Sequence, residues 1–579
     1  MEKWITSENG VPFSGEGDCT NALLELIERM QDGDELIFAK GTYYIKDQVL
    51  VKNRKGLKFR GYGSVIMSEY DKCHPNDCKT PLEFHNCDDF EITGITMTTT
   101  NLTNIYGRII AKDKEKGWFD VILPDDTYVS GNEWIEGLDT CNEDLSVNFH
   151  IGWADMGTPH RYYKINRNTI RFLVWPTKRP QLDNVHIGEI ICMRYSLYAP
   201  GNFCCIGCNN FLFEDITIEA CPGESCVIYP SSSNFTFRRY NVKLPIGSKQ
   251  AIACNTDGIH IVGMRGKLIL EDCHFEYMGD DSLNVHAQCG NIYAVHGNTV
   301  ESGILKYNKT IDEPPAESLS PDYAKKGDII YIYDSDSKIK KGEMTVDAYE
   351  KNRFTVSEIK GEYKRGDILV NSAYYPETVI KNCSISRSRA RGLLIQTDGV
   401  TVENCHFEKT AGAAIFTVVG IGFWNEMGPA CNMVIKNCTF EGCRTSYVPE
   451  KAAGIAIGHN DNRNVPDNET GVFNNISILG NKFYNLNDPA IYASGVKGLE
   501  IKNNEFFNCG DKEEHSKFEY DIVAHSLSLI HISEPTRPYC GDKEEHSKFE
   551  YDIVAHSCED ISVCENTSDS GKLIFEESI

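Results

Sequence analysis

Three aspartates occur in two short motifs that are separated by a regular interval. Asp257 lies in the run Asn-Thr-Asp-Gly, and Asp280 and Asp281 lie in Gly-Asp-Asp, 23 and 24 residues further along the chain. One coil of a parallel β-helix takes roughly twenty residues or slightly more, so residues one coil apart lie on strands about 4.7–4.9 Å apart. We therefore expect one cluster of carboxylates. Such a cluster is seldom kept for stability alone, because close carboxylates repel each other and are costly to desolvate.

The chemistry that suits this cluster is glycoside hydrolysis. That reaction needs a protonated carboxyl group at the leaving oxygen and an ionised carboxylate on the other side of the bond. Mutual repulsion and partial burial separate the pKa values of clustered carboxyl groups and so supply both forms. We interpret Asp257 as the general acid. Either Asp280 or Asp281 would deprotonate water while the other holds the water or a sugar hydroxyl, and both can reach a cleft only from a turn or bulge.

Two other interpretations of the aspartates stay open. Asp-Gly and Gly-Asp are ordinary turn sequences, and either motif alone is explained equally well as a corner of the chain. Three clustered aspartates are also a ligand set for calcium. Because both motifs occur one coil apart, we favour catalysis and predict neither a metal ion nor a cofactor.

Two arginines are candidates for the same site. They belong to the run Arg-Ser-Arg-Ala-Arg-Gly at 387–392, which opens the first coil after a long interruption of the repeat. Arg389 or Arg391 beside the aspartates would keep a carboxylate ionised and donate hydrogen bonds to sugar hydroxyls. The alternative is a solvated, charged turn.

Further candidates for substrate binding follow the aspartates. Asn284 and His286 occupy alternate positions of one expected strand and therefore share a face. His286 is equally well explained as a structural hydrogen-bond partner. In a long loop, Trp424 would pack on the apolar face of a galactose ring while Glu426 accepts hydroxyl protons. The alternative for Trp424 is a plug that holds the loop against the helix.

Short Asn-Cys turns recur along the chain and indicate its architecture. Asparagine tolerates the left-handed backbone conformation and bonds neighbouring backbone groups, and a cysteine at a fixed place in each coil is typical of an inward-facing core residue. We therefore predict an all-β fold, a right-handed parallel β-helix. The members of the series are Asn86-Cys87, Gly207-Cys208, Asp272-Cys273, Asn382-Cys383, Asn404-Cys405, Asn437-Cys438, Gly480-Asn481 and Asn503-Asn504.

A cap and two insertions modify this repeat. An amphipathic helix is expected at 22–30, where it would cover the open end of the first coil. The stretches 102–196 and 289–374 contain alternating strands and share Gly-acid-Ile motifs. We interpret them as small inserted β-barrels or sandwiches, the second of which would border the site. The predicted organisation is 1–101 (β-helix with cap), 102–196 (first insert), 197–288 (catalytic coils), 289–374 (second insert) and 375–579 (β-helix).

One segment near the C-terminus does not fit the repeat. Residues 509–526 recur letter for letter at 540–557. The peptide between the copies resembles a translated adapter sequence from library preparation. We interpret 527–557 as an artefact of sequence assembly and exclude it from the fold prediction.

Composition and charge limit the classes of partner. The net charge of −26 disfavours nucleic acid and anionic membranes. No run approaches 18 apolar residues, and the N-terminus has no apolar region typical of a signal peptide. The chain has 23 cysteines, an odd number, which does not suit a framework of disulfides. The expectation is a cytoplasmic protein without disulfides, or a secreted one if a leader precedes this N-terminus. The inserts offer surface for a homo-oligomer.

With these residues assembled, the chain resembles glycoside hydrolase family 110, the α-1,3-galactosidases. The likeness covers the cap, the β-helix, both inserts, and the runs Asn-Thr-Asp-Gly, Gly-Asp-Asp-Ser-Leu-Asn-Val-His, Arg-Ala-Arg-Gly and Trp-Asn-Glu-Met-Gly-Pro. It implies an inverting, metal-independent exo-enzyme that releases terminal α-1,3-linked galactose from glycans such as blood-group-B-type or linear α-Gal structures. It also implies Asp257 as acid and Asp280 or Asp281 as base.

Two alternatives compete with this resemblance. Family 28 polygalacturonases share Asn-Thr-Asp and Asp-Asp on a β-helix. They also carry a Gly-His-Gly turn and an Arg-Ile-Lys triplet, and neither occurs here at a suitable position. A non-catalytic, carbohydrate-binding β-helix is the second alternative, and it would need no carboxylate cluster.

Overall fold

The structure is a computed structural model of the 579-residue chain. It describes the chain except for residues 1, 154–160, 306–309, 316, 420–425, 429, 446–452, 459–470, 487–488, 510–523, 526–530, 533–552, 557, 565 and 569–579. Trp424 and most of the segment 527–557 therefore lie outside the described residues. Two short strands of that segment are described, β47 (His531–Ile532) and β48 (Ile553–His556).

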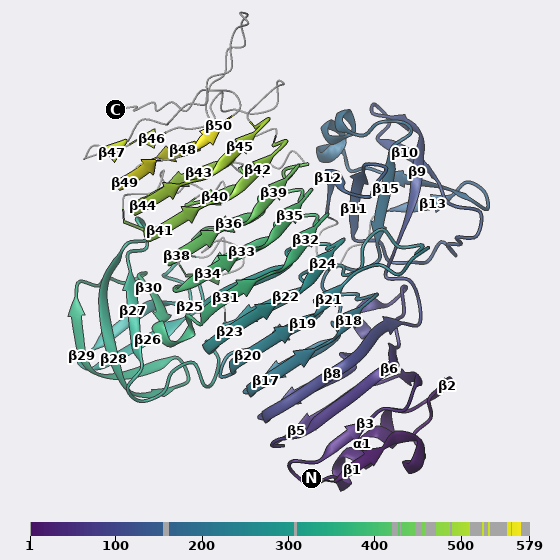
Figure 1. Ribbon diagram of the computed structural model, residues 1–579, viewed down its shortest axis with the longest axis horizontal. Helices are drawn as coiled ribbons and strands as arrows, with labels where there is room; N and C mark the ends of the chain where they lie inside the picture. The colour runs from purple at the N-terminus through teal and green to yellow at the C-terminus, as the bar shows by residue number, and fades with distance from the viewer. Residues whose placement is uncertain are drawn as a thin grey trace, which may run out of the picture.

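Parallel strands stack coil upon coil from the N-terminal to the C-terminal end and confirm the predicted β-helix (Figure 1). One parallel sheet contains β6 (Lys58–Ser68), β8 (Asp88–Thr99), β17 (Asn209–Glu214), β20 (Ser233–Arg238), β23 (Arg265–Glu271), β31 (Glu377–Lys381), β34 (Val400–Glu403), β38 (Cys431–Lys436), β41 (Phe473–Leu479) and β44 (Val496–Lys502). A second contains β5 (Val49–Lys52), β7 (Leu82–His85), β16 (Phe203–Ile206), β19 (Cys226–Ile228), β22 (Ile259–Val262), β25 (Leu283–His296), β33 (Leu393–Gln396), β36 (Ile415–Thr417), β40 (Ile455–Ile457) and β43 (Ile491–Ser494).

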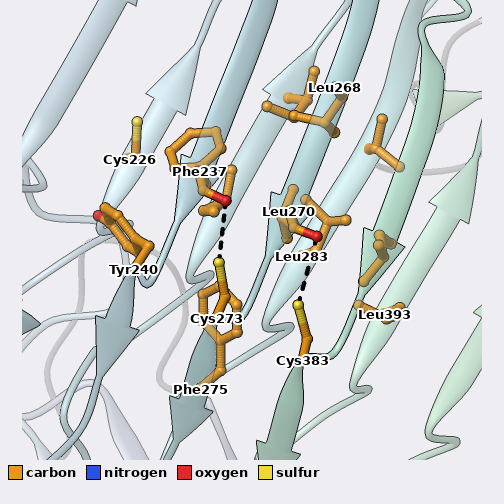
Figure 2. Packing of buried hydrophobic residues seen from close by; sticks show 14 of the residues in the cluster. Cys226, Phe237, Tyr240, Leu268, Leu270, Cys273, Phe275, Leu283, Cys383 and Leu393 are labelled. Atoms are coloured by element: carbon orange, nitrogen blue, oxygen red, sulfur yellow. Dashed lines mark hydrogen bonds between the residues drawn. The ribbon is translucent and has the colours of Figure 1, made fainter. Parts of the chain in front are cut away.

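The core of the β-helix is built from equivalent side chains stacked on successive coils. Alternate residues of each strand point inward, so apolar residues at the same strand position meet their counterparts one coil away. Phe407, Phe440 and Phe483 form such a column, with ring centroids 4.9 and 4.7 Å apart and nearly parallel rings. Figure 2 shows part of this interior, where Phe237, Leu270 and Phe275 pack with the cysteines.

The asparagine turns have the conformation that the sequence predicts. Asn382 and Asn404 have φ values of 55° and 54°, in the left-handed region. The following residues, Cys383 and Cys405, point inward and are 2% exposed. Their thiols contact carbonyl oxygens of the preceding coil, for example Cys383 Sγ to Leu270 O at 3.7 Å (Figure 2). The cysteines that the structure describes are thiols and not halves of disulfides.

The N-terminal helix covers the first coils as predicted. It is α1 (Thr20–Arg29), slightly earlier than expected because Asp18 accepts hydrogen bonds from the backbone N–H and hydroxyl of Thr20. Leu23, Leu26 and Ile27 are buried in the core of the β-helix. The helix thereby closes the N-terminal end of the stack (Figure 1).

The first interruption is an antiparallel sheet. Its seven strands are β9 (Asn104–Asp113), β10 (Trp118–Ile122), β11 (Gly137–Cys141), β12 (Val147–Trp153), β13 (Tyr162–Lys164), β14 (Thr169–Leu173) and β15 (Ile190–Arg194), in the order β12-β11-β15-β9-β10-β14-β13. Among the described residues the outer strands β12 and β13 do not pair, so hydrogen bonds do not close this sheet into a barrel.

The second interruption closes on itself. Strand β25 pairs with both β26 (Thr299–Gly303) and β30 (Ile368–Asn371), and β27 (Ile329–Tyr333), β28 (Lys340–Glu350) and β29 (Arg353–Gly361) complete the ring. The boundary that we expected after residue 288 falls within β25. This one strand therefore carries residues of the coil at its start and residues of the insert at its end. No described helix is long and apolar enough to cross a membrane.

Candidate active site

Asp257, Asp280 and Asp281 meet on adjacent coils, as their spacing predicts. The pairing of Ile259 in β22 with Leu283 in β25 places the segments before these strands side by side. If one carboxylate oxygen is taken from each aspartate, these three oxygens all lie within 4.8 Å of one another. The segments lie so close that a Cβ atom on Gly279 would lie 2.1 Å from the carbonyl oxygen of Asn255. Asp280 and Asp281 belong to an irregular turn, which lets both side chains reach the cluster.

Each of the paired aspartates has its own arginine. Arg389 Nη2 lies 3.1 Å from Asp280 Oδ2. Arg391 binds both oxygens of Asp281, from its backbone N–H at 2.9 Å and from Nη2 at 2.8 Å. The structure thus brings both candidate arginines to the site, one for each carboxylate.

The environments of the carboxyl groups differ. Burial raises the pKa of Asp257 well above its ordinary value, and the nearby Asp281 and Asp280 raise it further. Burial also raises the pKa of Asp281, to about 7, although Arg391 opposes the rise. Burial and repulsion therefore both favour the neutral form of Asp257, which is the form that a general acid needs.

The first insert supports the catalytic turns, a contribution that the sequence did not reveal. Arg194 of β15 is fully buried and donates to the carbonyl oxygens of Asn255 and Gly279 at 2.8 and 3.0 Å. Asp139 of β11 balances its charge at 3.1 Å. Arg389 Nε also donates to Gly279 O, at 2.5 Å. The turn that carries the aspartate pair is therefore fixed from two sides.

A second polar group lies on the strand next to the aspartates. Glu426 of β37 (Glu426–Met427) accepts hydrogen bonds from Asn284 Nδ2 at 3.3 Å and from Gln396 Nε2 at 3.0 Å. His286 Nε2 lies 3.7 Å from Glu426 Oε1 and 3.0 Å from His260 Nε2. The structure thus gathers three of the expected substrate-binding residues, Asn284, His286 and Glu426.

His260 and Gln396 were not among the residues expected here. The strand register contains the signal that would have found them. His260 pairs with Asn284 one coil away, and His286 pairs with Gln396 one coil further along. The reasoning that placed Asn284 and His286 on one face therefore applies equally to their neighbours on adjacent coils.

Tyr198 and Glu224 also lie close enough to the cluster for its charge to affect them. Desolvation and the negative charges of Asp280 and Asp257 raise the pKa of Tyr198. Desolvation, reinforced by Asp280, raises the pKa of Glu224 to about 7. The ring of Tyr198 is partly exposed, at 38%, so it is an aromatic surface available beside the cluster.

Two groups of side chains have the chemistry of metal ligands. One is the aspartate cluster, and the other is His260, His286 and Glu426, whose ligand atoms also lie within 4.8 Å of one another. In the second group both ring nitrogens of each histidine already face a partner in the protein. In the first group, Arg389 and Arg391 already pair with Asp280 and Asp281. We therefore assign no metal to either group.

The spacing of the carboxylates bears on stereochemistry. Inverting glycosidases typically separate their two carboxyl groups by about 6.5–9.5 Å, and retaining enzymes by about 5–5.5 Å. The oxygens of this cluster lie within 4.8 Å of one another. This limit applies to one oxygen of each aspartate and not to the separation of whole carboxyl groups, so it assigns the cluster to neither class.

Comparisons with known proteins agree with the fold and name an activity in relatives. A family model described as a right-handed β-helix region matches residues 323–475. Alpha-1,3-galactosidase A of Bacteroides fragilis is 27% identical over 48% of this chain and 46% of its own length. Alpha-1,3-galactosidase B of Bacteroides thetaiotaomicron is 28% identical over 47% of this chain and 44% of its own length. The chain thus spans about half the length of the curated relatives it matches.

Solved structures give a more distant likeness. The family 28 exopolygalacturonase of Yersinia enterocolitica is 9% identical, with a TM-score of 0.40 over 99% of this chain and 79% of that one. A likeness of this degree carries no conclusion about activity.

Proposed function

We propose that this protein is a glycoside hydrolase that releases terminal α-1,3-linked galactose from oligosaccharides. The observation that carries the proposal is the cluster of Asp257, Asp280 and Asp281, in which burial and repulsion favour the neutral form of Asp257 and an arginine pairs with each of the other two. The names of the curated relatives support the linkage and the sugar.

In the proposed reaction Asp257 donates its proton to the glycosidic oxygen while a water molecule attacks the anomeric carbon. We assign the general base to Asp280. Arg391 occupies both oxygens of Asp281, whose side chain is only 2% exposed. Asp280 contacts Arg389 through Oδ2 and is more exposed, at 14%, which leaves its other oxygen for water. Asp281 then positions the acid and the base relative to each other.

The sugar hydroxyls would be bound by polar groups beside the aspartates. Asn284 Oδ1 is buried and has no hydrogen-bond partner among the described residues, so a hydroxyl donor from the substrate would satisfy it. Glu426, held by Asn284 and Gln396, is placed to accept a second hydroxyl proton. Tyr198 offers its ring to the apolar face of a sugar.

The proposed stereochemical course is inversion, which the family resemblance implies. Direct attack by water on the α-linked sugar would release β-galactose first, whereas a covalent intermediate on Asp280 would release α-galactose first.

The experiment compares α-1,3-galactobiose, a fucosylated B-type trisaccharide and polygalacturonate as substrates, with the first-formed anomer followed by proton NMR. The expected result is release of β-galactose from one or both α-galactosides and no action on polygalacturonate. Cleavage of polygalacturonate alone would replace the proposal with the family 28 alternative. Binding without turnover of any of the three would favour a carbohydrate-binding β-helix.

A further inference from the structure

A line of polar contacts leads away from Asp257 through two histidines to a backbone carbonyl group. Asp257 Oδ2 lies 3.3 Å from His260 Nδ1. His260 Nε2 lies 3.0 Å from His286 Nε2. His286 Nδ1 lies 3.2 Å from the carbonyl oxygen of Ala287. Every ring nitrogen of the two histidines therefore faces a partner in the protein, and His286 Nε2 has a second, more distant neighbour in Glu426 Oε1 at 3.7 Å.

The carbonyl group fixes the direction of the hydrogen bonds along this line. A carbonyl oxygen only accepts, so His286 Nδ1 must carry a hydrogen. In neutral His286 the other nitrogen, Nε2, then accepts, and His260 Nε2 must be the donor. Neutral His260 is left with an unprotonated Nδ1, which faces Asp257 Oδ2. The partner of that nitrogen has to donate, and an aspartate can donate only when it is protonated.

The remaining contact of Asp257 agrees with this assignment. The backbone N–H of Asp281 donates to Asp257 Oδ1 at 3.0 Å, so Oδ1 is an acceptor and the proton belongs on Oδ2. The approach of Oδ2 to His260 Nδ1 at 3.3 Å is a polar contact that would become a hydrogen bond when substrate binds, since catalytic hydrogen bonds are often long or poorly aligned before that.

From this geometry we infer that His260 is a positioning residue that keeps the general acid Asp257 protonated on Oδ2, and that His286 and the Ala287 carbonyl group set the tautomer of His260 for this purpose. The inference rests on the proposed function. In the reaction the Oδ2 proton passes to the glycosidic oxygen as the bond from that oxygen to the anomeric carbon breaks. The ionised Asp257 then faces the lone pair of His260 Nδ1, which favours its reprotonation from solvent.

The opposite distribution of protons requires a doubly protonated His286. Its Nε2 would then donate to His260, and His260 Nδ1 would donate to an ionised Asp257. That arrangement would place a charged ring where His286 is only 5% exposed, with Glu426 Oε1, 3.7 Å away, as its counter-charge. Both oxygens of Glu426 also already accept hydrogen bonds, from Asn284 and Gln396. Burial and the neighbouring His286 lower the pKa of His260 to about 4, which keeps it neutral.

Several other charged or titratable groups face the Asp257–His260 pair and contribute to any pH dependence. Four acidic groups raise the pKa of Asp257 by repulsion, and Arg391 lowers the pKa of the neighbouring Asp281. These groups are Asp280, Asp281, Glu224, Glu426, Arg389, Arg391, Arg194 and Tyr198. A variant of His260 leaves all of them in place, so a change in its pH profile reports on the histidine.

The first test uses leaving groups of different acidity. A galactobiose leaving group needs protonation, whereas 2,4-dinitrophenolate leaves without it. We expect His260→Phe to lower kcat on α-1,3-galactobiose by roughly 10–100-fold, part of the 10²–10⁴-fold that a general acid contributes. On 2,4-dinitrophenyl α-galactoside the loss should stay below about threefold. The alkaline limb of the pH profile should move to lower pH, because the acceptor that favours protonated Asp257 is gone. Equal losses on both substrates with an unmoved limb would overturn the inference.

Matched variants separate a positioning role from a structural one. His274→Phe changes a histidine on β24 (His274–Glu276), where His274 contacts Glu276 rather than the site, and should leave both activities unchanged. His260→Asn keeps an amide oxygen that can accept from Asp257, and its alkaline limb should lie between those of wild type and His260→Phe. A His260→Asn limb identical to that of His260→Phe would count against the role of the acceptor.

The second test does not depend on activity. Nitrogen-15 NMR of the histidine-labelled protein near pH 7 should show His260 protonated at Nε2 and His286 protonated at Nδ1. A doubly protonated His286, or a His260 protonated at Nδ1, would overturn the inference even in an active enzyme. Failure of the proposed function is recognised separately, because wild-type protein would then hydrolyse neither galactoside whatever the tautomers are.

Discussion

The backbone N–H of Asp281 donates a hydrogen bond to Asp257 Oδ1 at 3.0 Å, across two neighbouring coils. This bond joins the segment that carries Asp257, the proposed acid, to the segment that carries Asp280, the proposed base. The two catalytic carboxyl groups therefore do not need to share a proton to stay close together. The bond also leaves Oδ2 of Asp257 as the oxygen that carries the proton. The distance between the catalytic groups is therefore set by the β-helix itself, through the register of β22 and β25.

The assignment of Asp280 as the base makes a prediction about chemical rescue. Alanine at the base position removes proton abstraction from water, but azide attacks without losing a proton. We expect added azide to restore the activity of Asp280→Ala on an activated aryl α-galactoside by more than about tenfold, with β-galactosyl azide as the product, since base catalysis contributes about 10²–10⁴-fold. Asp281→Ala should not be rescued. Rescue of Asp281→Ala alone would exchange the roles of the two residues.

Arg391 is predicted to affect the acidic limb of the pH profile through Asp281, the residue that positions the acid and the base, and not through the base Asp280. Burial and Asp280 raise the pKa of Asp281, and Arg391 opposes this rise. With the arginine present the pKa of Asp281 is about 7. In Arg391→Met the pKa of Asp281 rises further, so Asp281 ionises only at higher pH and the acidic limb should move upward. Activity should then fall more at pH 6 than at pH 8. The control is Arg387→Met, because Arg387 pairs with Glu276 and Glu408 instead. An acidic limb that is the same in wild type and Arg391→Met would contradict this role.

Much of the site was predictable because the chain repeats. The interval between Asp257 and the Asp280–Asp281 pair equals one coil, so adjacency followed from spacing. Arg389 and Arg391 were predictable for the same reason, since they open the next coil. Which arginine serves which aspartate depends on side-chain direction at an irregular turn, and no spacing rule gives that.

The remaining parts of the site come from contacts that no repeat encodes. Arg194 and Asp139 reach the catalytic turns from the first insert, whose antiparallel strands have their own register. The inserts themselves were recognised by their length and by their alternating strands. The sequence did not reveal that, in the part of the chain that the structure describes, only the second insert closes into a ring. Trp424 lies outside the described residues, so its proposed contact with the sugar stays a prediction.

The asparagines that replace cysteine in the last coils are predicted to be important for stability. Asn504 accepts from the backbone N–H and side-chain Nδ2 of Asn481 and donates to Ile478 O at 2.8 Å, all in the buried core. Asn504→Ala leaves these groups unpaired, and each buried unpaired group costs about 1–3 kcal/mol. We expect a clear fall in the urea midpoint, whereas Ser477→Ala on the exposed face of β41 should change it little. Equal midpoints for the two variants would show that this ladder contributes no stability.

Activity is predicted to survive removal of metal ions. Both nitrogens of His260 and of His286 face protein partners, and burial disfavours the ionised form of Asp257. Exhaustive dialysis against EDTA should leave kcat on α-1,3-galactobiose within about twofold, since none of these groups needs a cation to balance it. Loss of activity that added calcium or zinc restores would require an ion at one of the two ligand groups described above.

The measurement that tests the central claim most directly is kcat of Asp257→Asn on α-1,3-galactobiose, with the thermal unfolding midpoint recorded on the same preparation. The asparagine keeps an oxygen that can accept from the Asp281 N–H, so the unfolding midpoint should be unchanged. Because the amide has no acidic proton, kcat should fall by about 10²–10⁴-fold. A folded Asp257→Asn variant with turnover within tenfold of wild type would contradict the account.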